Sequence, residues 1–266
     1  MANLLSSNQE KQARAGRGFD MQPRLQPLTR GRYSARLAET PEDLCAALQL
    51  RTRAFQTDTP DGDDFDAACA HVLIEDINTA KVVCCFRMLM LEGGCELTSS
   101  YSAQFYDLQA LQDFPDRMVE LGRFCMDPSH QDPDILRIAW GAMTAFVDEN
   151  RVEMLFGCSS FAGTETTQYL DAFAMLKARH LAPKRWLPRV KAPDVFRYAA
   201  RLRRKPDAKK AMSRMPPLLK TYLLMGGWVS DHAVVDRQMN TLHVFTGVEI
   251  GAIPDARKRL LRSVAG

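Results

Sequence analysis

The stretch that decides the fold is MVELGRFCM at residues 118–126, followed by PDILRIAWGAMTAF at 133–146 and EMLFGCSSF at 153–161. The first and third segments are short and rich in apolar and β-branched or aromatic residues, as buried strands are. The middle segment starts with a proline, which is favoured at the first helical position, and its apolar residues recur at helical spacing. Strand, helix and strand therefore follow one another.

The same reasoning extends in both directions along the chain. Before this unit, Thr40 and Pro41 mark a helix start, and the acidic, glycine- and proline-containing stretch 56–66 is expected to be a loop. Strands are predicted at 33–37, 71–75, 81–91 and 242–250, and helices at 165–180, 194–204 and 254–264. The pattern predicts an α/β (α+β) protein with a mixed central sheet flanked by helices.

The organisation predicted for the chain is a single main domain with two appendages. Residues 1–30 are polar and basic and are expected to be a loose N-terminal arm. The domain is predicted over 31–252, with a basic helical segment inserted at 177–214, and 253–266 is predicted to be a C-terminal basic helix.

Composition restricts the class of protein. The chain has 266 residues, of which 46% are hydrophobic and 25% charged, as expected of a globular protein with a full core. The longest uncharged apolar stretches, 138–147 and 221–230, are well below the roughly 20 residues of a membrane-spanning helix, and the N-terminus lacks a signal-peptide pattern. A cytoplasmic location is expected. Neither the seven cysteines nor the five histidines have metal-ligand spacing, so no metal site is expected.

Positive charge is concentrated in one region. Residues 177–214 have a net charge of +12, against +3 for the whole chain, so the remainder is negative. A basic patch of this kind is either a solvated face or a surface for a polyanion such as an acidic carrier protein or an anionic membrane. Because aromatic residues are not interleaved with the basic ones, no nucleic-acid partner is expected. The helix expected at 194–204 would present Arg197, Arg201 and Arg204 on one side.

Several short sequence motifs, called words below, resemble those of a known family. The order of predicted elements is that of the Gcn5-related N-acetyltransferase (GNAT) fold. The more specific words resemble the ornithine N-acyltransferase family of ornithine-lipid synthesis, whose members are also called hemolysin-like. These words are LRTRAF at 50–55, DDFD at 63–66, CFRML at 85–89, ELGRFCMDP at 120–128, LFGCSSFAGT at 155–164 and MPPLLKTYLLMGGWV at 215–229.

A shorter set of the same words resembles the acyl-homoserine lactone synthases. The two resemblances together imply a catalytic pair, Glu120 and Arg123, and a substrate site on neighbouring elements. The substrate-binding residues that the resemblances imply are Arg51, Phe55, Asp63, Asp66 and Arg87, and Arg53, Phe124, Cys125, Ser159 and Ser160 are further candidates. The residues expected to contact a carrier protein or a membrane are Lys184, Arg185, Arg189, Lys191, Arg197, Arg201 and Arg204.

The chemistry explains why these residue types suit the site. Aminolysis of a thioester needs a neutral amine, yet an α-amino group with a pKa of about 8 is mostly protonated near neutral pH. Glu120, on a central strand, is the candidate general base, acting directly or through one water. In a regular strand Arg123 would point to the opposite face, so the two side chains meet only if a bulge intervenes. The arginines could bind the acceptor carboxylate or orient Asp63 and Asp66.

The resemblance implies an enzyme that transfers a 3-hydroxyacyl group to the α-amino group of ornithine, at or near the inner membrane surface. GNAT enzymes that use acetyl-CoA have a glycine-rich turn before the helix that follows the fourth strand. The corresponding stretch here, 130–135, has no glycine and two aspartates, which favours the phosphopantetheine thioester of acyl carrier protein as donor, with no bound cofactor. Alternatives are glutamine or another amino acid as acceptor, a homoserine lactone synthase, or a non-catalytic membrane-binding protein. Cys158 and Cys125 could form an acyl-enzyme but are typical of strand cores.

Overall fold

The computed structural model describes residues 22–265. Its strands are β1 Leu28–Arg30, β2 Tyr33–Leu37, β3 Ala70–Asp76, β4 Lys81–Leu91, β5 Tyr106–Asp107, β6 Met118–Met126, β7 Met154–Ala162, β8 Arg189–Val190, β9 Val195–Phe196, β10 Trp228–Val229, β11 Ala233–Asp236 and β12 Thr241–Glu249. Its α-helices are α2 Pro41–Phe55, α3 Pro133–Glu149, α4 Leu170–Arg179, α5 Tyr198–Arg201, α6 Ala208–Arg214, α7 Pro217–Leu224 and α8 Asp255–Ala265.

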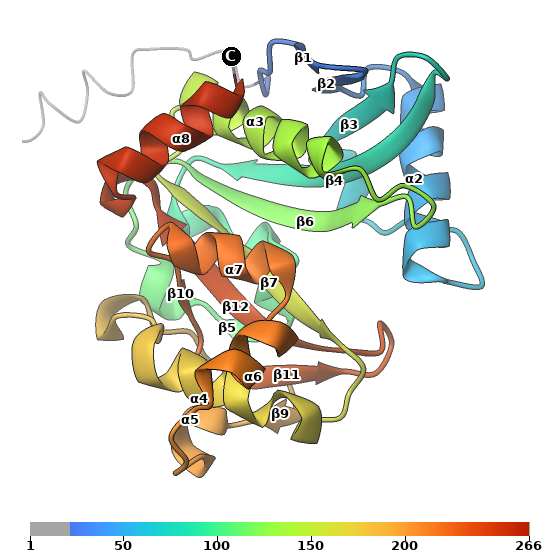
Figure 1. Ribbon diagram of the computed structural model, residues 1–266. Helices are drawn as coiled ribbons and strands as arrows, with labels where there is room; N and C mark the ends of the chain where they lie inside the picture. The colour runs from blue at the N-terminus through green and yellow to red at the C-terminus, as the bar shows by residue number, and fades with distance from the viewer. Residues whose placement is uncertain (1–21, 266) are drawn as a thin grey trace, which may run out of the picture.

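Ten strands form one twisted sheet in the order β1-β2-β3-β4-β6-β7-β12-β11-β9, with β10 on the outer side of β12. Figure 1 shows this sheet running through the molecule, with α3 and α8 near one end and α4, α5 and α6 near the other. All paired neighbours are antiparallel except β6 and β7, which are connected through α3 and therefore run parallel. The predicted mixed sheet with flanking helices is confirmed.

Helices cover both faces of the sheet. On one face, α3, α7 and α8 pack on a core that includes Phe86, Leu121 and Val248, and α4 and α6 pack beside them on Phe161 and Val244. The other face is covered by α2 and by the irregular segment 94–114. Because strand side chains alternate between the faces, the neighbours of Leu121 on β6 point to the second face.

The first half of the chain follows its local signals closely. Strands β2, β4 and β6 have the predicted bounds. Helix α2 begins with a capping box, in which the Thr40 hydroxyl accepts from the Asp43 amide and the Asp43 carboxylate accepts from the Thr40 amide. Such a box satisfies amides that the first helical turn leaves without partners.

The prediction of a loose N-terminal arm needs correction. Residues 1–21 of the expected loose arm lie outside the described residues, but 22–30 are built into the fold: β1 pairs with β2, and Leu25 is buried. The amides of Arg24 and Gln26 donate to Asn150 and Glu149 at the end of α3. These tertiary contacts leave no periodic pattern in the sequence.

The basic segment is not the helical insertion that the sequence predicted. Instead of a helix over 194–204, residues 195–196 form strand β9 against β11, and only 198–201 are helical. The Tyr198 side chain is buried and its hydroxyl donates to the Ser230 carbonyl, which draws this stretch onto the sheet. The apolar residues that suggested an amphipathic helix therefore pack as edge strand and core. The C-terminal helix α8 is present as predicted.

The parallel strands β6 and β7 separate partway along their length. Their register joins 118–120 to 154–156 and ends at Glu120 and Phe156. Just beyond, Gly157 has a φ of +156°, and a Cβ atom added there would lie 2.4 Å from the Leu121 carbonyl oxygen. A residue with a side chain cannot occupy this contact, so glycine permits the close approach from which the two strands diverge.

We predict that Gly157→Ala lowers the free energy of unfolding by about 3 kcal/mol or more, because both the backbone conformation and the Cβ position become strained. Urea denaturation measures the change. Gly251→Ala is the matched control, since an added Cβ at Gly251 meets no atom within 4 Å. Equal stability of both variants would show that β6 and β7 can separate without a glycine at 157.

Candidate active site

A cavity of about 530 Å³ occupies the gap between the separating strands. It is lined by strands β4, β6, β7 and β12, by the C-terminal end of α2, by the start of α7 and by the segment around Tyr101. The residues used below are Phe55, Arg87, Tyr101, Glu120, Arg123, Phe124, Cys158, Ser159, Ser160, Leu218, Leu219, Tyr222, Asp236 and His243.

The cavity collects side chains from both faces of the sheet. Leu218, Leu219 and Tyr222 of α7 line it on the face that α3 and α4 cover. Glu120, Arg87 and Tyr101 line it on the face that α2 and residues 94–114 cover. An apolar end and a polar end thus meet where the sheet opens, which suits a reaction that joins an apolar group to a polar one.

Glu120 lies at the point where the two strands part. Its side chain is 5% exposed and accepts three hydrogen bonds from one turn: from the Tyr101 amide (2.8 Å), the Ser102 amide (2.7 Å) and the Ser102 hydroxyl (2.5 Å). Burial raises the pKa of Glu120, and these hydrogen bonds only partly oppose that increase. Among residues 22–265 Glu120 has no ion-pair partner, so its contacts are those of a buried carboxylate with a raised proton affinity.

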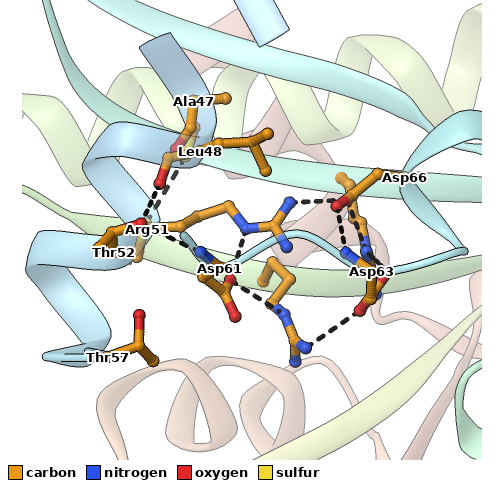
Figure 2. A network of polar contacts seen from close by, with 12 residues as sticks. Ala47, Leu48, Arg51, Thr52, Thr57, Asp61, Asp63 and Asp66 are labelled. Carbon is orange, nitrogen blue, oxygen red and sulfur yellow. Dashed lines mark hydrogen bonds and ion pairs between the residues drawn. The ribbon is translucent and has the colours of Figure 1, made fainter. Parts of the chain in front are cut away.

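Three arginines and three aspartates form a buried network beside Glu120 (Figure 2). Arg51 of α2 donates to Asp61 (2.7 Å) and to Asp66 (2.6 Å). Arg87 of β4 donates to the same Oδ1 of Asp66 (2.6 Å) and to both carboxylate oxygens of Asp63. The charges balance, as burial of so many ionised groups requires.

Arg123 joins this network because β6 bulges. Opposite β4, the register steps from Cys125 to Gly122, so Arg123 and Phe124 have no paired residue, and Arg123 has a φ of +52°. Its guanidinium pairs with Asp61 (3.2 Å) and Asp63 (3.0 Å) and lies over the Tyr101 ring. The sequence did not show whether β6 has a bulge. The structure has one, and this bulge places Arg123 at the same cavity as Glu120.

The network contains one residue that sequence reasoning missed. Asp61 is buried and bridges Arg51 and Arg123. It precedes the DDFD word by two positions, in the stretch DGDDFD, so the density of acids was the available signal. The conformation of the loop decides which of those acids are buried. In this loop the Asp61 amide donates a hydrogen bond to the Thr52 hydroxyl.

Five of the ten predicted substrate residues line the cavity, and Arg87 is one of them. Phe55, Phe124, Ser159 and Ser160 line it, and the Ser159 hydroxyl accepts from Thr246 (2.9 Å). The other five do not line the cavity: Arg51, Asp63 and Asp66 belong to the adjacent ionic network, whereas Arg53 and Cys125 lie outside both. Arg53 is exposed and lies 3.6 Å from Asp127, and Cys125 is buried beneath α2 against Cys85. Helical spacing turns the Arg53 side chain outward, whereas Cys125 lies on the same face as Glu120 but is covered by α2, away from the cavity.

Cys158 lines the cavity but is poorly suited to covalent chemistry. Burial raises the pKa of its thiol, and its sulfur contacts the Ser102 hydroxyl. A nucleophilic thiolate needs the opposite environment, with a depressed pKa. Cys158 therefore lines the cavity but is not suited to carry the acyl group.

The seven predicted contact residues of the basic segment are all exposed. Three of them have partners: Arg185 contacts Glu249 and the Trp186 ring, Lys191 donates to the Ala103 carbonyl, and Arg204 pairs with Asp171. Among the described residues, Lys184, Arg189, Arg197 and Arg201 make no side-chain hydrogen bond or ion pair within the chain.

Within 22–265 no helix is long and apolar enough to span a bilayer. The same residues contain no cluster of three metal-ligating side chains.

A family model matches the part of the chain that carries this site. Residues 44–141 match the family model described as "Acetyltransferase (GNAT) domain". That match covers α2, the β3–β4 hairpin, β6 and the first half of α3, which are the elements that carry the network and Glu120. Over these residues the chain is similar to a GNAT acetyltransferase domain.

Relatives along nearly the whole chain have a more specific name. A protein of Rhodobacter capsulatus named L-ornithine N(alpha)-acyltransferase is 29% identical over 243 residues, which is 85% of this chain and 93% of the relative. A protein of the same name from Brucella abortus is 29% identical over 239 residues, 81% of this chain and 83% of the relative. The resemblance predicted from the sequence words is confirmed.

Solved structures with a similar fold include FeeM, an N-acyl amino acid synthase from uncultured soil microbes. It is 11% identical, with a TM-score of 0.46 over 90% of this chain and 98% of that one. The CoA-dependent acyl-homoserine lactone synthase BjaI is 13% identical, with a TM-score of 0.45 over 85% of this chain and 83% of that one.

We predict that the buried network makes stability depend on pH in the acidic range. Burial favours the neutral form of Asp66, but hydrogen bonds from Arg51, Arg87 and the Asp63 amide outweigh it and lower the pKa to about 2. A carboxylate whose pKa is depressed on folding stabilises the protein above its ordinary pKa near 4, and this stabilisation is lost as the pH falls toward 2.

Asp66→Asn should therefore lower the free energy of unfolding by roughly 3 kcal/mol at pH 7 and flatten its decrease between pH 4 and 2. Chemical denaturation at several pH values measures both effects. Asp113→Asn, at an exposed position, serves as the control and should leave the curve unchanged. An unaltered slope in Asp66→Asn would show that this carboxylate is not held ionised by the arginines.

Proposed function

We propose that the chain is an L-ornithine N(alpha)-acyltransferase that moves a 3-hydroxyacyl group from the phosphopantetheine thioester of acyl carrier protein to the α-amino group of ornithine, giving lyso-ornithine lipid. The observation that carries the proposal is a buried carboxylate, Glu120, at the fork of two separating strands in a cavity with an apolar and a polar end. The name shared by the relatives at 29% identity supports the acceptor.

The reaction exchanges a thioester for an amide. The α-ammonium group first gives one proton to Glu120, and the neutral amine attacks the thioester carbonyl carbon. The C–N bond forms, the C–S bond breaks, and the thiolate takes up the second proton that the nitrogen loses. No covalent acyl-enzyme is needed, which agrees with the raised pKa of Cys158.

Glu120 suits the role of base because two opposing effects act on the pKa of its carboxyl group. Burial alone raises its pKa toward that of an amine, whereas the hydrogen bonds from Ser102 and Tyr101 keep the carboxylate available as an acceptor. Those three bonds also hold the side chain in one position at the fork, so that the proton acceptor is preorganised.

The acceptor carboxylate is expected at Arg123. The Arg123 guanidinium lines the cavity and lies over the Tyr101 ring. Arg51 belongs to the same ionic network but does not line the cavity, and it is only 1% exposed. Asp61 and Asp63 fix Arg123 in place while leaving part of its fork toward the cavity. Arg53, which is outside the cavity, has no role in this scheme.

The donor arm fits the gap between β6 and β7. Beyond Glu120 and Phe156 the facing edges of these strands are not paired with each other, so their peptide groups can bind the amides of a phosphopantetheine arm as a neighbouring strand would. The acyl chain then extends toward the apolar residues of α7.

The helix that follows β6 favours a carrier protein over CoA as donor. At the N-terminus of α3 the Asp132 carboxylate accepts from the Asp134 amide and from the Tyr33 hydroxyl. The position where a pyrophosphate would need free amides is thus filled by negative charge. A carrier protein instead presents an acidic surface, which the exposed residues of the basic segment complement. We place the enzyme in the cytoplasm, peripheral to the inner membrane where its product is consumed.

We predict that Glu120→Ala remains folded and loses about 10² to 10⁴-fold in kcat, as expected for removal of a general base. Ser102→Ala separates catalysis from structure. It deletes a hydrogen bond that lowers the pKa of Glu120, so the acidic limb of the pH–rate profile should move to higher pH. Ser100→Ala, a buried serine whose hydroxyl bonds the Leu97 carbonyl rather than Glu120, is the control. An unmoved limb in Ser102→Ala would place the base elsewhere.

We also predict that 3-hydroxyacyl carrier protein outcompetes the matching CoA thioester. The double reversal Arg197→Glu and Arg201→Glu should raise KM for the carrier protein roughly tenfold at low salt and less at high salt, with kcat retained. Reversal of Arg30 on β1 and Lys81 on β4, two exposed residues on strands remote from β9, is the control. Liposome flotation of the same variants tests membrane contact separately. If CoA serves equally well and neither reversal matters, the donor assignment fails.

A further inference from the structure

A second carboxylate lines the cavity and takes no part in the scheme above. Asp236 ends β11, is 8% exposed, and accepts one hydrogen bond at Oδ1 from the Met239 amide (3.0 Å). Among residues 22–265 it has no cationic partner. Buried carboxylates are normally paired, because removing an isolated charge from water is costly.

A buried imidazole beside it also has a vacant position. His243 of β12 lines the same cavity and is 2% exposed. The Tyr106 hydroxyl uses its single proton on the His243 carbonyl, so Nδ1 must donate to the Tyr106 oxygen. Nε2 is then an acceptor, and it has no hydrogen-bond partner within the described chain. Burial lowers the pKa of His243 to about 4, which keeps the ring neutral at physiological pH.

The charge balance of the cavity points to a cationic ligand. The three arginines of the network are matched by their three aspartates. Within the described part of the chain, Glu120 and Asp236 remain as carboxylates without a guanidinium or ammonium partner. Both act electrostatically on Cys158, which lies between them. An acceptor with two amino groups could place one of them at Glu120 and the other at Asp236.

We propose that Asp236 and the Nε2 of His243 bind the cationic group at the end of the acceptor's side chain, and so select α-amino acids with a flexible aminoalkyl side chain over neutral ones. The proposal rests on the proposed function, because it places the α-amino group of the same molecule at Glu120. The aliphatic part of the side chain lies along Cys158 and Tyr101, whose phenol also interacts with Asp236.

The strand pairing is consistent with one continuous subsite. Phe245 pairs with Cys158, His243 with Ser160, and Val234 with His243, so these positions lie on one face of three adjacent strands. Asp236 is two residues from Val234 and points to the same face. Glu120, paired with Phe156, lies on this face as well, at the other end of β7.

A second hairpin provides a matched control. Asp76 ends β3 as Asp236 ends β11, each hairpin turn has four residues, and the last of them, Ala80 or Asn240, has a positive φ. Asp76 Oδ1 accepts from the Asn78 amide (3.0 Å), as Asp236 Oδ1 does from Met239. Asp76, however, is paired with Arg32 and lies outside the cavity. A turn-capping role alone would make the two aspartates equivalent.

The experiment compares L-ornithine and L-norvaline, which has the same carbon chain without the terminal amine, on the full chain and on Asp236→Asn. Asparagine keeps an acceptor for the Met239 amide and removes only the charge. We expect Asp236→Asn to lower kcat/KM for ornithine by about 30-fold or more and to leave norvaline within about twofold. Asp236→Glu should retain part of the preference, and Asp76→Asn should retain all of it.

Binding of the free amino acids, measured by isothermal titration calorimetry, gives a readout that does not need acyl transfer. Wild type should bind ornithine more tightly than norvaline, and Asp236→Asn should lose this difference. Equal losses for both amino acids, or an unchanged preference in Asp236→Asn, would overturn the inference. If the preference is seen in binding while no amino acid is acylated, the proposed function fails and the subsite stands.

Discussion

The parting of β6 from β7 is the constraint on which the site depends. Two strands that stayed paired to their ends would close the sheet and leave Glu120 against a packed neighbour. Instead, the parallel ladder ends at Glu120 and Phe156, and the contact between Gly157 and the Leu121 carbonyl marks the point of divergence. The opening exposes unpaired strand edges and side chains from both faces of the sheet to the cavity. The carboxylate of Glu120 lies at the point where the strands separate.

The ionic network stabilises the polar side of this opening. It ties α2, the loop 61–66, β4 and the β6 bulge into one unit through Arg51, Arg87 and Arg123. A buried network of this size adds little net stability compared with an apolar core, because desolvation offsets the attraction between the charges. Its value lies in geometry: it holds the guanidinium of Arg123 at the cavity while neutralising the acids around it.

The polar and apolar halves of the cavity correspond to the two faces of the sheet. Helix α7 and the cores beneath it present Leu218, Leu219 and Tyr222, whereas the other face presents carboxylates, arginines and the imidazole of His243. A thioester donor with a long acyl chain and a small charged acceptor differ in the same way. Approach from opposite faces would bring the carbonyl carbon and the amine together only at the fork, next to Glu120, and would keep the two substrates from exchanging places.

The sequence by itself determined the elements whose signals are local. Alternation in 33–37, the apolar run in 81–91, the Thr40 capping box and Pro133 specify their strands and helices without help from distant residues. The same local words identified Glu120, Arg87, Asp63 and Asp66 as site residues.

Only the tertiary structure decided the rest, because it depends on partners far apart in the chain. The bulge that turns Arg123 toward Asp63 exists through pairing with β4. Val195 and Phe196 become a strand, not a helix, because β11 offers them an edge. Asp61, Asp236 and His243 stand in no recognisable motif, and only the fold buries Asp236 and His243 in the cavity wall and Asp61 in the ionic network. Burial and the meeting of opposite charges are properties of the folded chain, and no local pattern of residues encodes them.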